Sequence, residues 1–152
     1  MKIDDWIVKH IQLLNENYRM KFEKYLIAPN ESSAIETVQK IESGNFALVS
    51  HGIQEDPIFN YGNKKALELF EMEFNDFIKL PSRKSAEPVH RDERAALLKE
   101  VTENGCINNY SGIRVSSTGK RFEIKNAKVF NLVDGHGAKY GQAAYFDEWQ
   151  YL

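Results

Sequence analysis

The sequence predicts an α+β fold, in which a five-stranded antiparallel sheet carries helices packed on one face and a helical extension precedes it. Three observations predict this fold. Residues 1–44 place apolar side chains at helical spacing, and residues 106–149 change to a period of two. Between them lie two short strand patterns and several short helical ones. Because helices and strands come in separate runs, the order favours α+β. We expect an extension over residues 1–44 and a core over residues 45–152.

The start of the chain predicts one long helix. Its apolar residues recur at intervals of three and four, which forms one stripe on a helix: Ile7, Ile11, Leu14, Tyr18, Phe22 and Tyr25. Pro29 ends this helix, because proline disfavours the helical conformation in the residue before it. The stripe can pack on the protein's own sheet or against a second copy, which would make a homodimer.

A shorter helix should follow. Asn30 or Ser32 can cap its first turn, and Gly44 can end it in the left-handed conformation. Its buried positions are Ala34 or Ile35, Val38 and Ile41.

Residues 46–51 alternate as a strand does, with Leu48 and Ser50 on one face and Val49 and His51 on the other. Because Ser50 and His51 point to opposite faces, they cannot form a nucleophile–base pair.

After a turn at Asp56-Pro57, residues 58–61 predict a second strand, and Asn63 can cap the helix that follows. That helix should bury Ala66, Leu67 and Phe70, with Leu69 on its flank.

Short helical turns over residues 74–83 are broken at Pro81 and Pro88. Asp92 can then cap another helix, which Gly105 closes. Its inward residues are Leu97, Leu98 and Val101. Residues 106–117, 121–133 and 139–149 predict three strands, joined by the hairpin turn sequences "SSTG" and "DGHG".

The segment "DPIFNYGNKKALELFEM", Asp56 to Met72, resembles the corner between the second strand and first core helix of PAS domains, with one extra residue before the tyrosine. Four separated blocks, from about residue 10 to 150, are similar to the MEKHLA domain, a PAS-related family. They are "SHGIQEDPIFNYGNKKALELFE", "LPSRKSAEP", "YSGIRVSSTGKRFEI" and "NLVDGHGAKYGQAAYF". That family occurs as stand-alone bacterial proteins and at the C-terminus of plant homeodomain–leucine-zipper regulators. The resemblance implies a PAS-like fold and a sensory or regulatory role, with no catalytic residues to assign.

Two amides are candidates for contact with a ligand between the sheet and the helices. By alternation Asn126 shares a face with Phe122 and Ile124, and Gln142 shares one with Tyr140, Ala144 and Phe146. A few polar groups in an apolar pocket orient a small molecule. Alternatively, these amides bond to the backbone or to each other, as buried amides must.

Asn60 and Arg83 complete the predicted ligand site. Asn60 is the extra residue of the PAS-like corner and has no evident structural role. Arg83 stands between two prolines in the helical turns that line a PAS cavity, where it could bind an acidic ligand. It could equally pair with a neighbouring acid.

Composition argues against several classes of partner. A net charge of −2 and a pI near 6.1 give no basic surface, so no direct nucleic-acid partner is expected. No run approaches 18 apolar residues, so no membrane span is expected. The N-terminus "MKIDDWIVKH" lacks the features of a signal peptide. We therefore expect a cytoplasmic protein.

The cofactor is not identified by the sequence. Because the four histidines lie far apart without paired spacing, no metal site is expected. Haem is not expected, since His90 only precedes the helix that carries the haem histidine in PAS domains. Flavin is not expected either, because the photoreceptor run "NCRFLQ" is missing and Cys106 opens a strand.

The reading that we favour is a sensory or regulatory module, not an enzyme. It binds a small organic ligand between sheet and helices and signals through a partner or a dimer interface, the N-terminal helix or the sheet. One alternative is a ligand-free interaction module whose cavity is filled by its own Phe and Tyr side chains. The other is a small enzyme that uses the same cavity.

Overall fold

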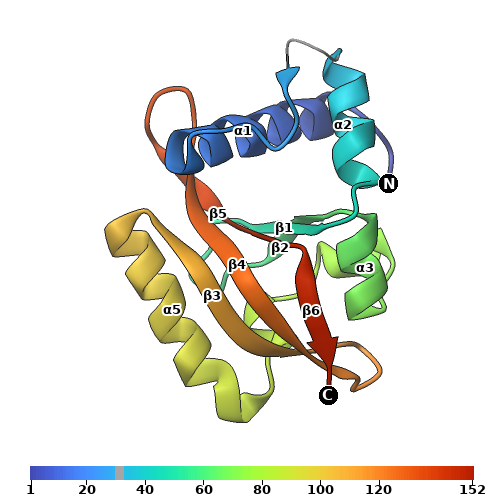
Figure 1. The fold of residues 1–152 in the computed structure, drawn as a ribbon, viewed down its shortest axis with the longest axis vertical. Helices are drawn as coiled ribbons and strands as arrows, with labels where there is room; N and C mark the ends of the chain where they lie inside the picture. The colour runs from blue at the N-terminus through green and yellow to red at the C-terminus, as the bar shows by residue number, and fades with distance from the viewer. Residues whose placement is uncertain (30–32) are drawn as a thin grey trace.

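The computed structural model describes residues 1–29 and 33–152 (Figure 1). The helices are α1 (Asp5–Phe22), α2 (Ala34–Glu42), α3 (Lys64–Phe70), α4 (Phe74–Phe77), the 3₁₀ turns η2 (Ser82–Ser85) and η3 (Pro88–His90), and α5 (Arg91–Asn104). The strands are β1 (Ala47–His51), β2 (Phe59–Gly62), β3 (Cys106–Val115), β4 (Arg121–Val133), β5 (Lys139–Phe146) and β6 (Glu148–Tyr151).

The strands form one antiparallel sheet in the order β2-β1-β5-β4-β3, and β6 also pairs with β4. β5 pairs with residues 128–133 of β4, and β6 pairs with residues 122–125. β6 therefore continues the line of β5 beyond Asp147. The predicted fold class is confirmed, and the predicted last strand is interrupted once.

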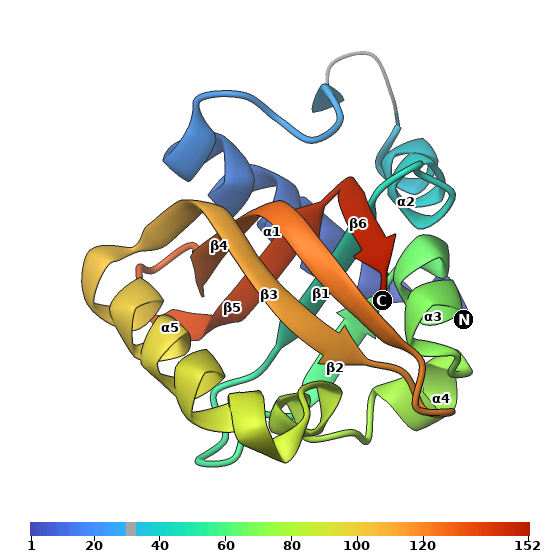
Figure 2. The ribbon, with the colours of Figure 1, turned by 60° about the horizontal axis from the view of Figure 1, so that its bottom comes forward.

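Helices cover both faces of the sheet (Figures 1 and 2). On the outer face, α1 and α2 pack on Leu48, Tyr61, Phe130 and Leu132. On the inner face, α3 and α4 pack on Val49 and Phe122, and α5 packs on Val129. The alternation predicted for β1 is confirmed, since Leu48 and Val49 belong to different clusters.

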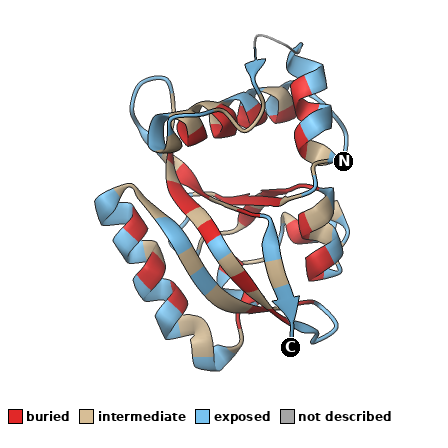
Figure 3. Cartoon of the chain, in the orientation of Figure 1, coloured by how far each residue is buried: buried red, intermediate tan, exposed pale blue. Residues whose placement is uncertain are grey.

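Helix α1 buries its stripe on its own sheet, as the red side of the helix in Figure 3 shows. Asp4 caps the helix by accepting a hydrogen bond from the Ile7 amide at 3.0 Å. The helix ends at Glu23, which has a φ of 65°, and not before Pro29 as predicted. The Asn15 side chain explains the early end, because it bonds the backbone of Leu26 and Ile27 and folds that segment back on the helix.

Helix α2 is capped by Ser33, whose hydroxyl accepts from the Glu36 amide at 3.2 Å. The predicted caps Asn30 and Ser32 lie outside the described residues. Val38 and Ile41 are buried as predicted, whereas Ala34 and Ile35 are exposed. The prediction of a left-handed Gly44 is wrong. A Cβ at Gly44 would lie 2.4 Å from the Phe46 ring, so a close approach, not a positive φ, requires glycine there.

The corner around Asn63 joins three elements. Its side-chain oxygen accepts hydrogen bonds from the Ala66 amide at 3.2 Å and the Leu48 amide at 3.1 Å. Its side-chain nitrogen donates to the carbonyls of Ile41 at 3.0 Å and Phe46 at 2.8 Å. The predicted cap is confirmed, and the same side chain also ties α2 to β1.

Two details of the middle helices differ from prediction. In α3, Leu69 is buried and Leu67 is only half-buried, the reverse of the expected order. α5 begins at Arg91, because the turn that starts at Pro88 leads directly into it, so Asp92 lies within the first turn and is not the cap.

Candidate functional site

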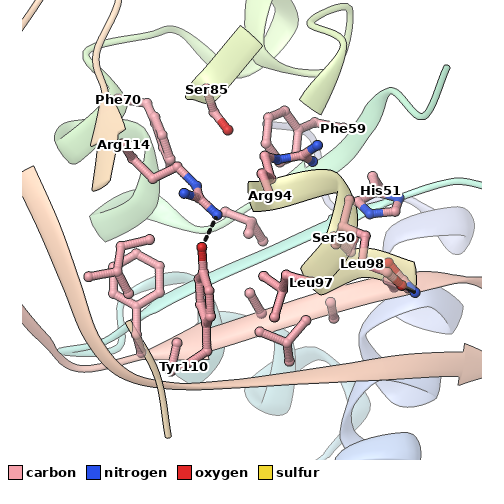
Figure 4. Close-up of a pocket in the computed structure, with 18 residues that line it drawn as sticks. Ser50, His51, Phe59, Phe70, Ser85, Arg94, Leu97, Leu98, Tyr110 and Arg114 are labelled. Carbon is pink, nitrogen blue, oxygen red and sulfur yellow. Dashed lines mark hydrogen bonds between the residues drawn. The ribbon is translucent and has the colours of Figure 1, made fainter. Parts of the chain in front are cut away.

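A cavity of about 60 Å³ lies between the inner face of the sheet and α5 (Figure 4). Its walls are mostly apolar: Val49, Phe59, Leu97, Ile124, Val129 and Phe146. About 10–15 Å³ of accessible space is enough for one water molecule, so the cavity has room for several waters or a small organic group. Polar side chains also reach it: His51, Ser85, Arg94, Tyr110, Arg114 and Gln142.

Arg94 and Arg114 are both only 8% exposed. Arg114 donates to the Tyr110 hydroxyl at 3.1 Å and to its neighbouring carbonyl at Ile113, and Arg94 donates to the Ser82 hydroxyl. Neither guanidinium forms an ion pair with an acid in the described part of the chain. Burial, and then the charge of Arg114, lower the pKa of Arg94 to about 10, so Arg94 stays charged at neutral pH.

His51 presents an unsatisfied nitrogen. Its Nδ1 lies 2.9 Å from the Gly52 carbonyl, which can only accept, so Nδ1 carries the proton. Its Nε2 is buried and has no hydrogen-bond partner among the described residues. Burial is the main cause that lowers the pKa of His51. The imidazole therefore presents an Nε2 lone pair that makes no hydrogen bond of normal geometry to a described residue, although the Gln142 side chain is close enough to act on the pKa of His51.

Gln142 lines the cavity as predicted, but its amide nitrogen is already used. Its two N–H groups are shared among three acceptors, the Leu98 carbonyl at 3.2 Å, the Thr102 hydroxyl at 2.8 Å and the Asn131 side-chain oxygen at 3.0 Å. These bonds tie α5 to β4 and β5. Gln142 therefore lines the cavity and also makes the hydrogen bonds to backbone and to another amide that were the alternative to ligand contact.

We expect Gln142→Leu to lower the free energy of unfolding by about 1–2 kcal/mol, because two part-buried acceptors on α5 lose the donor that ties them to the sheet. Amide hydrogen exchange over residues 98–104 should accelerate more than exchange in β1. Gln150→Leu is the matched control, since the Gln150 side chain is exposed and accepts a hydrogen bond from Lys125 at the surface, and its effect in urea unfolding should stay within about 0.5 kcal/mol. Equal acceleration in β1 and α5 would contradict the tether.

Asn126 does not line the cavity, and its predicted orientation is wrong. It has a φ of 53° and sits at a register shift in the β3–β4 pairing, so Ala127 takes the inward position. The Asn126 side chain is exposed and donates to Glu148 at 3.0 Å. A similar irregularity in the β4–β5 pairing turns Tyr140 to the outer face, against the predicted alternation with Gln142.

Arg83 and Asn60 also lie outside the cavity. Arg83 is exposed, and its Nε lies 3.1 Å from both carboxylate oxygens of Asp56. It therefore pairs with a neighbouring acid, which was the alternative to binding an acidic ligand. Asn60 accepts a hydrogen bond from Ser50 at 2.5 Å and lines a surface groove with Trp6 and Phe74. Of the four predicted ligand contacts, only Gln142 is brought to the cavity.

Ser50 pairs with His10 instead of His51. The two atoms, His10 Nε2 and Ser50 Oγ, are 2.8 Å apart, and both residues are 1% exposed. Because Ser50 donates to Asn60, it must accept the proton of His10, which is the reverse of what a general base does to a nucleophile. This pair ties α1 to the sheet.

Sequence reasoning missed the two buried arginines. Arg94 lies three and seven residues before Leu97 and Val101, so it falls on the apolar stripe of α5. Arg114 is two residues past Gly112 and four past Tyr110 on a strand. A charged residue on a face that is otherwise expected to be buried is the pattern in the sequence that could have identified both arginines.

No group of three or more His, Cys, Asp or Glu side chains that could hold a metal ion occurs within residues 1–29 and 33–152. Over the same residues, no helix has both the length and the apolar composition needed to cross a membrane.

Comparisons place the chain among known folds. A family model described as the MEKHLA domain matches residues 8–151, whereas a search of curated proteins gives no match. A PAS domain from Colwellia psychrerythraea is 13% identical, with a TM-score of 0.63 over 80% of this chain and 98% of that one. An RNA-binding light-oxygen-voltage receptor is 16% identical, with a TM-score of 0.61 over 80% of this chain and 33% of that one. At these identities the similarity shows the fold alone.

Proposed function

The chain belongs to the MEKHLA domain family, and we propose that it is a sensory or regulatory module that binds a small organic ligand between its sheet and α5. One observation carries the proposal. The cavity has apolar walls and convergent polar groups, among them the buried Nε2 of His51, which has no partner among the described residues. Such unsatisfied groups are costly unless a ligand or water bonds them.

Signal output would start at α5. This helix forms one wall of the cavity and is tethered to the sheet through Gln142. A ligand that contacts both sides changes the balance between tethered and released positions of the helix, because it binds one of them better. A partner that reads the position of α5 would receive the signal.

A homodimer remains part of the proposal, but not through the apolar stripe of α1. That stripe is buried on the chain's own sheet, which leaves Trp6 and Met20 as the large apolar side chains that α1 exposes. We also propose a cytoplasmic location.

The second candidate is a ligand-free interaction module. It is favoured by the small volume of the cavity and by the phenylalanine rings that fill the rest of the inner face: Phe59, Phe70, Phe77, Phe122 and Phe146. Native mass spectrometry of the purified protein separates the two, since a ligand-free module retains no small molecule.

We do not propose a flavin as the ligand, because the cavity is small for one. One light-oxygen-voltage domain of similar fold, 13% identical with a TM-score of 0.60 over 77% of this chain and 84% of that one, is described with a flavin analogue. Pockets for ligands of that size have volumes of about 300–1,000 Å³, far above the 60 Å³ found here. Cys106 packs against the outer-face cluster, on the other side of the sheet.

We expect Ala144→Val to abolish ligand binding without unfolding the protein, because the added methyl groups enter the cavity that Ala144 lines. In a thermal-shift screen of small metabolites, a ligand at 100 times its Kd should stabilise the parent protein by about 2.7 kcal/mol. The variant should lose most of that shift, and Ala138→Val, in the exposed turn before β5, should keep it. A full response from Ala144→Val would contradict binding at this cavity.

A further inference from the structure

Arg94 and Arg114 form a doubly positive centre that no carboxylate of the described residues pairs with. Both guanidinium groups line the cavity and neither has a carboxylate partner in residues 1–29 and 33–152 (Figure 4). Asp56, whose negative charge favours the charged form of Arg94, is already paired with Arg83. Removing a charge from water without a counter-ion costs several kcal/mol. The arrangement therefore has a reason other than the stability of the empty protein.

The two guanidinium groups also retain free donors. An arginine has five N–H donors. Arg94 uses one of them on Ser82, and Arg114 uses two, on Ile113 and Tyr110. The acceptors they have are neutral hydroxyl and carbonyl oxygens. The missing partner is therefore an anion with several acceptor sites.

Size and wall chemistry narrow the class of anion. A volume of about 60 Å³ is small beside the roughly 300–1,000 Å³ of typical ligand pockets, which favours a small anion over a nucleotide or sugar phosphate. Leu97, Ile124 and Val129 provide apolar surface that a bare inorganic ion cannot use. A carboxylate accepts two parallel bonds from a guanidinium fork and can carry a short hydrocarbon part.

We infer that the cavity binds a small organic acid, whose carboxylate accepts hydrogen bonds from Arg94 and Arg114 while its hydrocarbon part packs on Leu97 and Val129. The inference rests on the proposed function and names the class of its ligand. A hydroxyl on such an acid can donate to the free Nε2 of His51.

Propionate and propionamide test this inference on the unmodified protein, because they match in shape and differ in charge. In thermal shift and calorimetry, propionate should raise Tm and bind at least tenfold more tightly than propionamide. Phosphate and sulfate should give less stabilisation than propionate at equal concentration.

Arg114→Gln supplies a second test, with Arg83→Gln as the matched control because Arg83 is exposed and paired. Arg114→Gln should weaken propionate binding at least tenfold. The ligand-free variant should melt at or above the parent temperature, since one of two like charges is gone. A residue that served only the fold would lower Tm instead. Arg83→Gln should leave propionate binding unchanged.

Each of the other possible results would refute a specific part of the proposal. Equal binding of propionate and propionamide would refute the charge assignment and leave the ligand-binding function standing. Stabilisation by phosphate or sulfate as strong as that by propionate would refute the carboxylate class. If no acid binds and the metabolite screen and native mass spectrometry are also empty, the ligand-binding function itself fails.

Discussion

Replacing Asn63 with alanine should lower the free energy of unfolding by about 4 kcal/mol, because one fully buried side chain makes four hydrogen bonds. Alanine leaves two amides and two carbonyls without these partners. Each buried group left unsatisfied costs about 1–3 kcal/mol, although some relax towards new partners or water. The helix cap alone accounts for about 1 kcal/mol of the loss.

Urea unfolding followed by circular dichroism measures this loss. Asn63→Ser should recover about 1 kcal/mol relative to alanine, because its hydroxyl can still cap α3 but cannot bridge α2 and β1. Asn75→Ala, at an exposed position of α4, is the control and should stay within about 0.5 kcal/mol. A loss below about 1.5 kcal/mol for Asn63→Ala would show that the bridging bonds contribute little.

Asn63 also shows how far the sequence could predict the fold. Its role as a cap depends on the residues directly after it, and that part was predicted. Its bonds to Ile41 and Phe46 depend on where α2 and β1 meet, which no local pattern contains. The helix and strand periods were likewise local, so the fold class was confirmed. The end of α1 was missed, because the Asn15 side chain bonds a segment eleven residues further on.

The candidate site was harder to predict because it depends on register. One left-handed residue, Asn126, moves Ala127 to the inner face, and alternation cannot predict that shift. The hypothesis that Arg83 binds an acidic ligand chose the wrong arginine, because Arg94 and Arg114 line the cavity and Arg83 does not. Proline context favoured Arg83, whereas burial, which is a property of the folded chain, distinguishes the other two.

Lowering the pH from 6.5 to 4 should remove roughly 3 kcal/mol of stability through His10 alone. Burial lowers the pKa of His10 from 6.5 to about 4. Between these values the unfolded chain binds a proton that the folded protein does not, so the free energy of unfolding falls as the pH falls. The loss is about 1.4 kcal/mol per pH unit. It should be absent above pH 7 and level off below about pH 4.

The surroundings of His10 make this residue the main titrating group of the outer face. Trp6 stacks on its ring with centroids 4.6 Å apart, and Ser50, Tyr61 and Tyr140 complete the contacts. Burial raises the pKa of both tyrosines, so they stay neutral throughout this range. A positive charge on His10 would therefore have no acidic partner among these contacts, and α1 would be held less firmly on the sheet.

His10→Gln tests this assignment, because glutamine can still donate to Ser50 but does not titrate. Its stability should fall less steeply between pH 6.5 and 4 in urea unfolding at a series of pH values. The remaining slope belongs to His51, whose pKa burial also lowers, and to the carboxylates. His136→Gln, in the exposed β4–β5 turn, should keep the parent slope. If His10→Gln also keeps the parent slope, His10 binds its proton over the same pH range in the folded and the unfolded chain. The hydrogen bond from its Nε2 to Ser50 would then tolerate the positive charge.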